Sequence, residues 1–207
     1  MPKRSFRPPP TCRSDHWLIC QLVDPDSRVL DLGCGSGELL QLLATEKNVE
    51  GTGVEVSEEK VYECVSRGLS VHHGDIDEGL SDFPDEWFDY VILSQTLQEI
   101  RRPSLVIREM LRVGKRGIVS FPNFAHWRAR WQLLVHGTTP TVSAYPHEWY
   151  ETPNVQFLSI KDFQRLCTKE RFGIVHSVFL PRRGLIEFVP NLLAETAIFV
   201  LMKASRV

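Results

Sequence analysis

Three glycines at alternate positions, Gly33, Gly35 and Gly37, most restrict what this chain can fold into. The run at 28–32 before them is mostly apolar, as a buried strand requires, and leucines return at helical spacing over residues 39–43 behind them. Glycine permits a tight turn, and its missing Cβ lets a ligand approach the backbone. The order of strand, glycine turn and helix therefore predicts an α/β fold with a small-molecule site at the turn.

The glycine spacing and the acid before it distinguish between cofactors. A dinucleotide site has the pattern G-x-G-x-x-G and holds a pyrophosphate at the helix N-terminus, whereas this chain has G-x-G-x-G with Asp31 at the mouth of the turn. A carboxylate repels a pyrophosphate and suits the sulfonium and ammonium of S-adenosylmethionine. The run Asp31–Gly37 therefore resembles the first motif of class I S-adenosylmethionine-dependent methyltransferases. The other interpretation is an ordinary strand-to-helix turn.

The next two predicted strands, 51–56 and 69–73, end in further candidates. Glu55 follows Gly33 by 22 positions, where doubly wound folds place the acid that binds ribose hydroxyls; otherwise it is a solvated strand end. The resemblance implies that Asp75 accepts from the adenine amino group with Ile76 against the ring, and a turn aspartate is equally consistent. The predicted cofactor-binding residues are Asp31, Gly33, Cys34, Gly35, Gly37, Glu55, Val56, Asp75, Ile76 and Ser94.

Residues 94–99 follow the fourth predicted strand, 88–94, at the sheet edge where open α/β folds bind ligands. The segment offers amides and hydroxyls, and Glu99 is its only ionisable group. No catalytic base can be assigned from it. Methyl transfer can proceed by proximity and desolvation alone, so the lack of a base does not exclude methyltransferase activity, but it gives no support for it.

An aromatic insert at about 122–160 lies between the fifth and sixth predicted strands. Its first part, 124–136, has helical spacing, which places Trp127 and Trp131 on one face. The tryptophans could pack on the sheet, cover the cofactor cleft as a lid, form a basic-aromatic RNA platform, or bind a protein partner, because Trp, Tyr and Arg dominate binding hot spots. The candidate partner-binding residues are Trp127, Arg128, Trp131, Trp149 and Tyr150.

The composition excludes several classes of function. The net charge of −2 gives no reason to expect nucleic acid or an anionic membrane, and no apolar run approaches the roughly 18 residues of a membrane span. The N-terminal residues also lack the apolar stretch of a secretory signal. Five scattered cysteines without a C-x-x-C pair argue against a zinc site or a disulfide framework and fit reduced thiols in the cytoplasm. His72 and His73 point to opposite faces of a strand, so we expect one surface and one core histidine and no shared metal.

The remaining pattern predicts one domain at 14–207 after a disordered, basic, proline-rich arm at 1–13. Arg108 and Arg112 fall on the exposed face of a helix predicted at 103–113. The other predicted elements are helices at 15–22, 58–67 and 159–171, a turn at 114–117, and strands at 118–121, 172–180 and 194–202.

Several long runs go beyond a generic methyltransferase pattern. They are residues 88–98, 101–103, 108–124, 126–128, 149–154 and 190–193. Through them, about residues 14–203 closely resemble the MetW family of bacterial methionine-biosynthesis proteins. The chain departs from common members at Ser36, where Asp is frequent, and so has one carboxylate fewer at the turn.

The resemblance implies a class I methyltransferase fold, which is a doubly wound seven-stranded sheet, mostly parallel, with an antiparallel C-terminal hairpin. It also implies S-adenosylmethionine or S-adenosylhomocysteine in the cleft, and a cytoplasmic role as the activating partner of homoserine O-acyltransferase (MetX). The alternative is an S-adenosylmethionine-dependent methyltransferase acting on a small molecule or protein. The glycine spacing disfavours a nicotinamide oxidoreductase, and the slightly acidic charge disfavours RNA binding.

Overall fold

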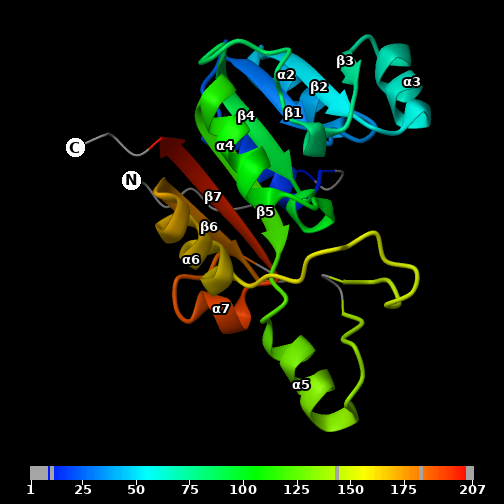
Figure 1. Ribbon diagram of the computed structural model, residues 1–207, viewed down its shortest axis with the longest axis vertical. Coiled ribbons are helices and arrows are strands. Elements are labelled where there is room, and N and C mark those ends of the chain that lie inside the picture. Colours follow the sequence, from blue (N-terminus) through cyan, green and yellow to red (C-terminus); the bar gives the residue numbers. More distant parts are fainter. Residues whose placement is uncertain (1–8, 10–11, 143–144, 182–183, 204–207) are drawn as a thin grey trace.

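A computed structural model describes residues 9, 12–142, 145–181 and 184–203 of the chain. Most of the predicted basic arm lies outside the described residues. Seven strands form one sheet in the order β3-β2-β1-β4-β5-β7-β6 (Figure 1). The strands are β1 (Arg28–Leu32), β2 (Glu50–Glu55), β3 (Ser70–His73), β4 (Phe88–Ser94), β5 (Gly114–Pro122), β6 (Phe172–Leu180) and β7 (Thr196–Lys203).

The pairing confirms the predicted sheet. Strands β1 to β5 run parallel, and β7 is antiparallel to both β5 and β6. Leu30 of β1 pairs with Thr52 of β2 and with Val91 of β4. Because the first five strands are parallel, their carboxyl ends share one edge, and the predicted cofactor residues lie at or just after those ends.

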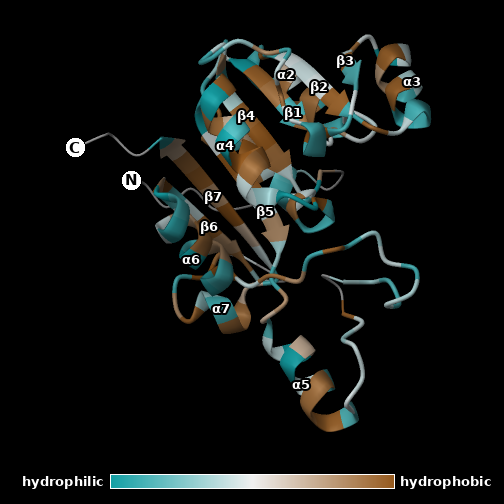
Figure 2. Ribbon diagram, in the orientation of Figure 1, coloured by the Kyte–Doolittle hydropathy of each residue, from teal (hydrophilic) through white to brown (hydrophobic). Residues whose placement is uncertain are grey.

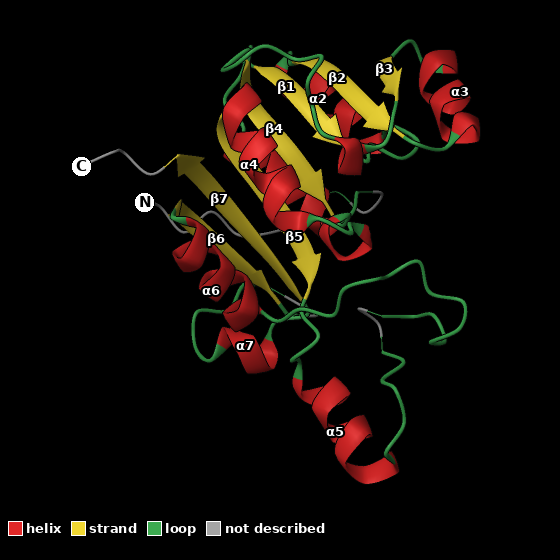
Figure 3. Ribbon diagram, in the orientation of Figure 1, coloured by secondary structure: helices red, strands yellow, loops and turns green. Residues whose placement is uncertain are grey.

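Helices cover both faces of the sheet (Figure 3). They are α1 (Ser14–Leu22), α2 (Glu38–Lys47), α3 (Glu58–Ser66), α4 (Pro103–Val113), α5 (Trp127–His136), α6 (Ile160–Glu170) and α7 (Pro190–Leu193), with short 3-10 turns η1 (Ile76–Glu78) and η2 (Leu97–Glu99). One buried cluster joins the sheet to α4 and α6, and another joins it to α1 and α2. Strand β1 supplies both clusters, since Val29 and Leu30 point to opposite faces. No helix in the described part of the chain is long and apolar enough to cross a membrane.

Three local predictions are wrong. The turn expected at 114–117 is the start of β5, which follows α4 directly; at Gly114 a Cβ would lie 2.5 Å from a Val91 methyl, so only glycine fits there. Arg112 is half-buried, because its guanidinium binds Glu109, Asp85 and two backbone carbonyls.

The third concerns the two histidines of β3. Both His72 and His73 are exposed, because β3 is an edge strand and neither ring enters the core. Helix α6 begins as predicted, and Ser159 and Asp162 form a reciprocal capping box at its start.

The aromatic insert leaves the sheet after β5 and returns at α6. Figure 1 shows α5 extending away from the body of the molecule, and Figure 2 shows apolar residues toward the far end of this helix. At its base, Phe124, Tyr145 and Phe157 form a cluster of aromatic rings with centroids 4.9 to 5.9 Å apart. The Tyr145 hydroxyl donates to the carbonyl of Pro122 over 2.7 Å, which ties the insert to the end of β5.

Candidate ligand-binding pocket

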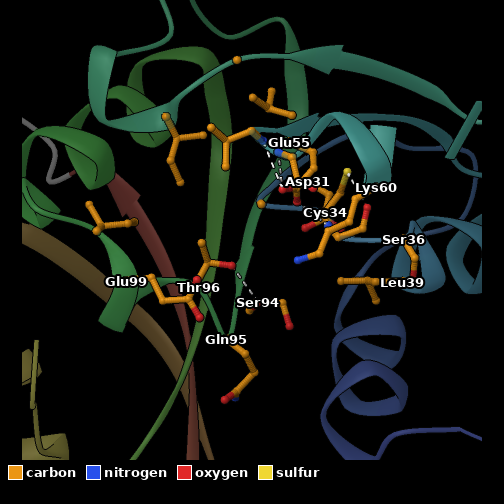
Figure 4. A pocket seen from close by; sticks show the side chains of 18 of the residues that line it. Asp31, Cys34, Ser36, Leu39, Glu55, Lys60, Ser94, Gln95, Thr96 and Glu99 are labelled. Atoms are coloured by element: carbon orange, nitrogen blue, oxygen red, sulfur yellow. Dashed lines mark hydrogen bonds between the residues drawn. The ribbon is translucent and has the colours of Figure 1, made fainter. Parts of the chain in front are cut away.

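A cavity of about 830 Å³ opens at the carboxyl ends of β1, β2 and β4. Its wall is formed by the glycine turn, the residues that follow β2 and β3, the segment after β4, and the N-terminal part of α1. Figure 4 shows Asp31 and Glu55 next to one another, with Thr96 and Glu99 entering from the β4 side. All the predicted cofactor-binding residues line this cavity except Gly37, which lies one residue beyond Ser36.

The glycine turn is built as predicted. Gly33, Gly35 and Gly37 have φ of +70°, +58° and +80°, a region that residues with a Cβ rarely adopt. A Cβ at Gly37 would lie 2.3 Å from Leu69 Cδ1, so this glycine allows the turn to contact the strand region beside it. A Cβ at Gly35 would meet nothing within 4 Å, because this position faces the cavity. Gly35 is therefore where a ligand can approach the backbone.

Asp31 is the most unusual group in the cavity wall. Its side chain is 2% exposed, and Oδ1 has no hydrogen-bond partner among the described residues. Burial, and then the nearby Glu55 carboxylate, raise the pKa of Asp31 to about 7, against a smaller opposing effect of Arg13. Buried polar atoms without partners are rare and costly in folded proteins. A cationic donor from a ligand would satisfy this oxygen.

Glu55 is held firmly by backbone amides. Its Oε2 accepts from Gly35 N over 2.8 Å, and its Oε1 accepts from Val56 N and Ser57 N over 3.1 and 3.0 Å. The residue is only 6% exposed, so the alternative of a solvated strand end is wrong. Oε1 already accepts two bonds, whereas Oε2 accepts one and keeps a further lone pair, which suits a ribose hydroxyl.

The third predicted subsite lies after β3. Asp75 Oδ1 accepts from Asp77 N over 2.8 Å and caps η1, so the turn role left open by the sequence is present. Asp75 also lines the cavity, together with Ile76 and Val56. Val56 is 62% exposed, an unusual position for a valine beside a cavity. Its surface and that of Ile76 could cover the face of a flat ring.

The segment after β4 supplies hydroxyls and amides, as predicted. Ser94 Oγ lies 3.3 Å from Ser120 Oγ, and Thr96 Oγ1 donates to the Ser94 carbonyl over 3.0 Å. Burial raises the pKa of Glu99, and Lys60 and His147 act against this. In the described part of the chain, no group of three or more His, Cys, Asp or Glu side chains could hold a metal ion.

Sequence reasoning missed the contribution of α1. Arg13, the N-cap residue of α1, and His16 both line the cavity. His16 is 8% exposed, and burial, followed by the charge of Arg13, lowers its pKa, so the imidazole is neutral at pH 7. The two residues are three positions apart, which places them on one helix face, but nothing local indicates that this face meets the glycine turn.

The aromatic insert is exposed and does not reach the cavity. Trp127, Trp131, Trp149 and Tyr150 are 45%, 59%, 68% and 65% exposed, so the interpretation that the tryptophans pack on the sheet is wrong. Arg128 lies over the Trp127 ring at 5.4 Å and 3.9 Å from Glu195. None of the described insert residues lines the cavity, which contradicts a lid.

Comparisons with known proteins agree with this geometry. A family model described as methionine biosynthesis protein MetW matches residues 13–201. The bifunctional methionine biosynthesis protein MetXA/MetW of Rhodopirellula baltica is 35% identical over 209 residues, covering 95% of this chain; the chain spans 34% of that relative's length. A demethylmenaquinone methyltransferase of Listeria welshimeri is 28% identical over 177 residues, 75% of this chain and 74% of the relative.

Solved structures share the fold at low identity. A possible histamine N-methyltransferase of Thermotoga maritima, described as S-adenosylmethionine-dependent, superposes with a TM-score of 0.67 at 19% identity, covering 91% of this chain and 87% of its own. A chain from the complex between the Haloferax volcanii Trm112 methyltransferase activator and a putative methyltransferase gives 0.65 at 17% identity, covering 92% and 91%. These likenesses show the class I methyltransferase fold.

Proposed function

The chain belongs to the MetW family of methionine biosynthesis proteins, and we propose that it binds S-adenosylmethionine or S-adenosylhomocysteine and activates homoserine O-acyltransferase (MetX) as a partner protein. The observation that most supports binding of this ligand is Asp31, a buried carboxylate with an unpartnered oxygen in the cavity wall. The backbone beside it, at Gly35, is open to the cavity.

The residues present fit an adenosyl sulfonium ligand. Asp31 would accept from its ammonium, Glu55 from its ribose hydroxyls, and Asp75 from its adenine amino group. Val56 and Ile76 would lie against the ring, and the glycine turn would leave room for the chain that joins ribose to amino acid. When bound, S-adenosylmethionine supplies an activated methyl group.

Two observations support homoserine O-acyltransferase as the partner: the name of one relative and the exposed aromatic side chains of the insert. The Rhodopirellula baltica protein is named for both MetXA and MetW, which joins the two functions in one chain. In this chain the aromatic insert presents Trp127, Trp131, Trp149 and Tyr150 to solvent, and such side chains dominate protein-binding hot spots. We place the acyltransferase contact on this surface, with Arg128 beside it.

The test is an acyltransferase assay with and without this protein. We expect acyltransferase activity to rise when this protein is added and to change with the concentration of S-adenosylhomocysteine. Calorimetry measures the binding of S-adenosylhomocysteine independently. Trp131→Ala should weaken activation at least tenfold. Its matched control is Trp87→Ala, because Trp87 is 51% exposed and lies outside the insert. The proposal would be refuted if acyltransferase activity were the same with and without this protein at every concentration of S-adenosylhomocysteine.

A second function is favoured by one observation. His16 is buried beside the cavity, its imidazole is neutral, and no hydrogen bond to it is found within the described residues. A neutral imidazole can accept the proton that a hydroxyl or amine loses on methylation. A methyltransferase acting on a small molecule or protein is therefore the alternative. Transfer of labelled methyl from S-adenosylmethionine to an acceptor in cell extract, lost in His16→Gln, would support it.

A further inference from the structure

One short segment, residues 94–99, touches both the cavity and the aromatic insert. Its cavity-lining members are Ser94, Gln95, Thr96 and Glu99. Gln98, the residue before Glu99, does not line the cavity. The backbone carbonyl of Gln98 accepts from Val155 N and from Gln156 N, both over 2.9 Å. These two amides belong to the returning part of the insert. The insert is thus hydrogen-bonded to the segment that forms one wall of the cavity.

The segment is held in an unfavourable conformation. Gln95 has φ of +54°, the left-handed region, and its N–H is held by the Ser120 carbonyl and hydroxyl over 3.0 and 3.1 Å. Gln98 is 5% exposed; its Nε2 donates to the Gln95 carbonyl over 2.6 Å, while its Oε1 is buried without a partner among the described residues. Strain and an unsatisfied buried oxygen in one segment mark a place where a second arrangement is close in free energy.

The glycine turn presses on the same segment. At Gly33 a Cβ would lie 2.7 Å from Thr96 Cγ2, so backbone and side chain are already in close contact. A ligand that moves the turn must therefore move Thr96, because packed interiors transmit small shifts. A second link is electrostatic: His147 of the insert acts on the Glu99 carboxylate in the cavity wall.

We propose that S-adenosylmethionine or S-adenosylhomocysteine bound in the cavity orders residues 94–99 and, through the Gln98 carbonyl, fixes the position of the aromatic insert. This regulation rests on the proposed function, since it connects the proposed ligand site to the proposed partner surface. By thermodynamic linkage, a partner that binds the fixed insert raises the affinity for the ligand by the same factor.

The test is amide hydrogen exchange on the full chain with and without saturating S-adenosylhomocysteine, with binding measured by calorimetry. We expect exchange at Val155 and Gln156 to slow at least tenfold. Amides of α6, which makes no hydrogen bond to residues 94–99 within the described part of the chain, should change less than twofold. In Val155→Pro, which removes one of the two bonds to Gln98, the ligand should still bind and the protection gained at Gln156 should fall below threefold.

The matched control is Thr139→Pro, which places a proline at an exposed position of the same insert. It should bind ligand and gain protection at Gln156 as the parent chain does. If S-adenosylhomocysteine binds and neither amide changes by twofold, the coupling is refuted while the ligand site stands. If calorimetry shows no binding to the folded chain, the ligand site fails and the coupling fails with it.

Discussion

Replacing Asp31 with Asn should make the protein more stable and less able to bind its ligand. The carboxyl is buried, and its pKa is raised from 3.8 to about 7 by burial first and by Glu55 second. In the unfolded chain it ionises near its ordinary value. Between these two pKa values the folded state holds a proton that the unfolded state has released, so stability falls as the pH rises through this window.

The size of this loss of stability follows from the difference between the two pKa values of Asp31. At about 1.4 kcal/mol per pKa unit, the fall amounts to about 4 kcal/mol over the full window and about 3 kcal/mol between pH 5 and pH 8. Asn at this position does not titrate, so its own cost of burial is the same at every pH. The stability difference between Asp31→Asn and the parent chain should therefore grow by about 3 kcal/mol from pH 5 to pH 8. Groups such as His16 and Glu99 titrate in both proteins and cancel.

The assay is urea unfolding at four pH values from 5 to 8, with linear extrapolation to water. Glu59→Gln serves as the control, because this carboxylate is exposed. The free energy of unfolding of this variant should change with pH in parallel with that of the parent chain. Calorimetry on the same samples should show the affinity for S-adenosylhomocysteine reduced by roughly tenfold to a hundredfold, since a charged hydrogen bond contributes about 1.5–3 kcal/mol. A stability difference that does not change with pH would refute the reasoning.

Five further substitutions separate ligand, core and surface roles. Gly37→Ala, with φ of +80° and a Cβ 2.3 Å from a leucine methyl, should lower stability by about 2–4 kcal/mol, whereas Gly35→Ala should cost about 1 kcal/mol but abolish calorimetric ligand binding. Arg112→Ala should cost about 2–3 kcal/mol in urea unfolding, because it leaves two carboxylates and two carbonyls without their donor. Trp131→Ala and Trp149→Ala should leave the melting temperature within about 2 °C of the parent value, because these side chains are exposed.

Local pattern was sufficient to predict the glycine turn and the acid after β2. Each depends on a short run of residues, and the parallel sheet then brings the runs together at one edge. Glu55 illustrates this: its place at the end of a strand follows from the sequence, whereas the bond from Gly35 N to its carboxylate forms only when the glycine turn folds against β2.

Long-range contacts were beyond such reasoning. Arg13 and His16 reach the cavity only because α1 packs beside α2, and no periodicity within α1 reveals this. The exposure of the insert was hidden for the opposite reason. Trp127 and Trp131 have the spacing of a core-facing helix, and only the position of α5 outside the sheet shows that no core covers them.

Under the proposed function, the cavity and the insert have separate roles, the first in ligand binding and the second in partner binding. The buried Asp31 carboxyl, the left-handed backbone of Gln95 and the unpartnered Oε1 of Gln98 each cost stability, and all lie at the cavity or one residue from it. Selection for stability alone would remove such features. A ligand that donates to Asp31 Oδ1 would offset the cost of burying this carboxylate, so under the proposed function the bound state is the more stable one. If the proposed function holds, such a protein would report whether its ligand is present, and the exposed aromatic insert would be the surface that a partner contacts.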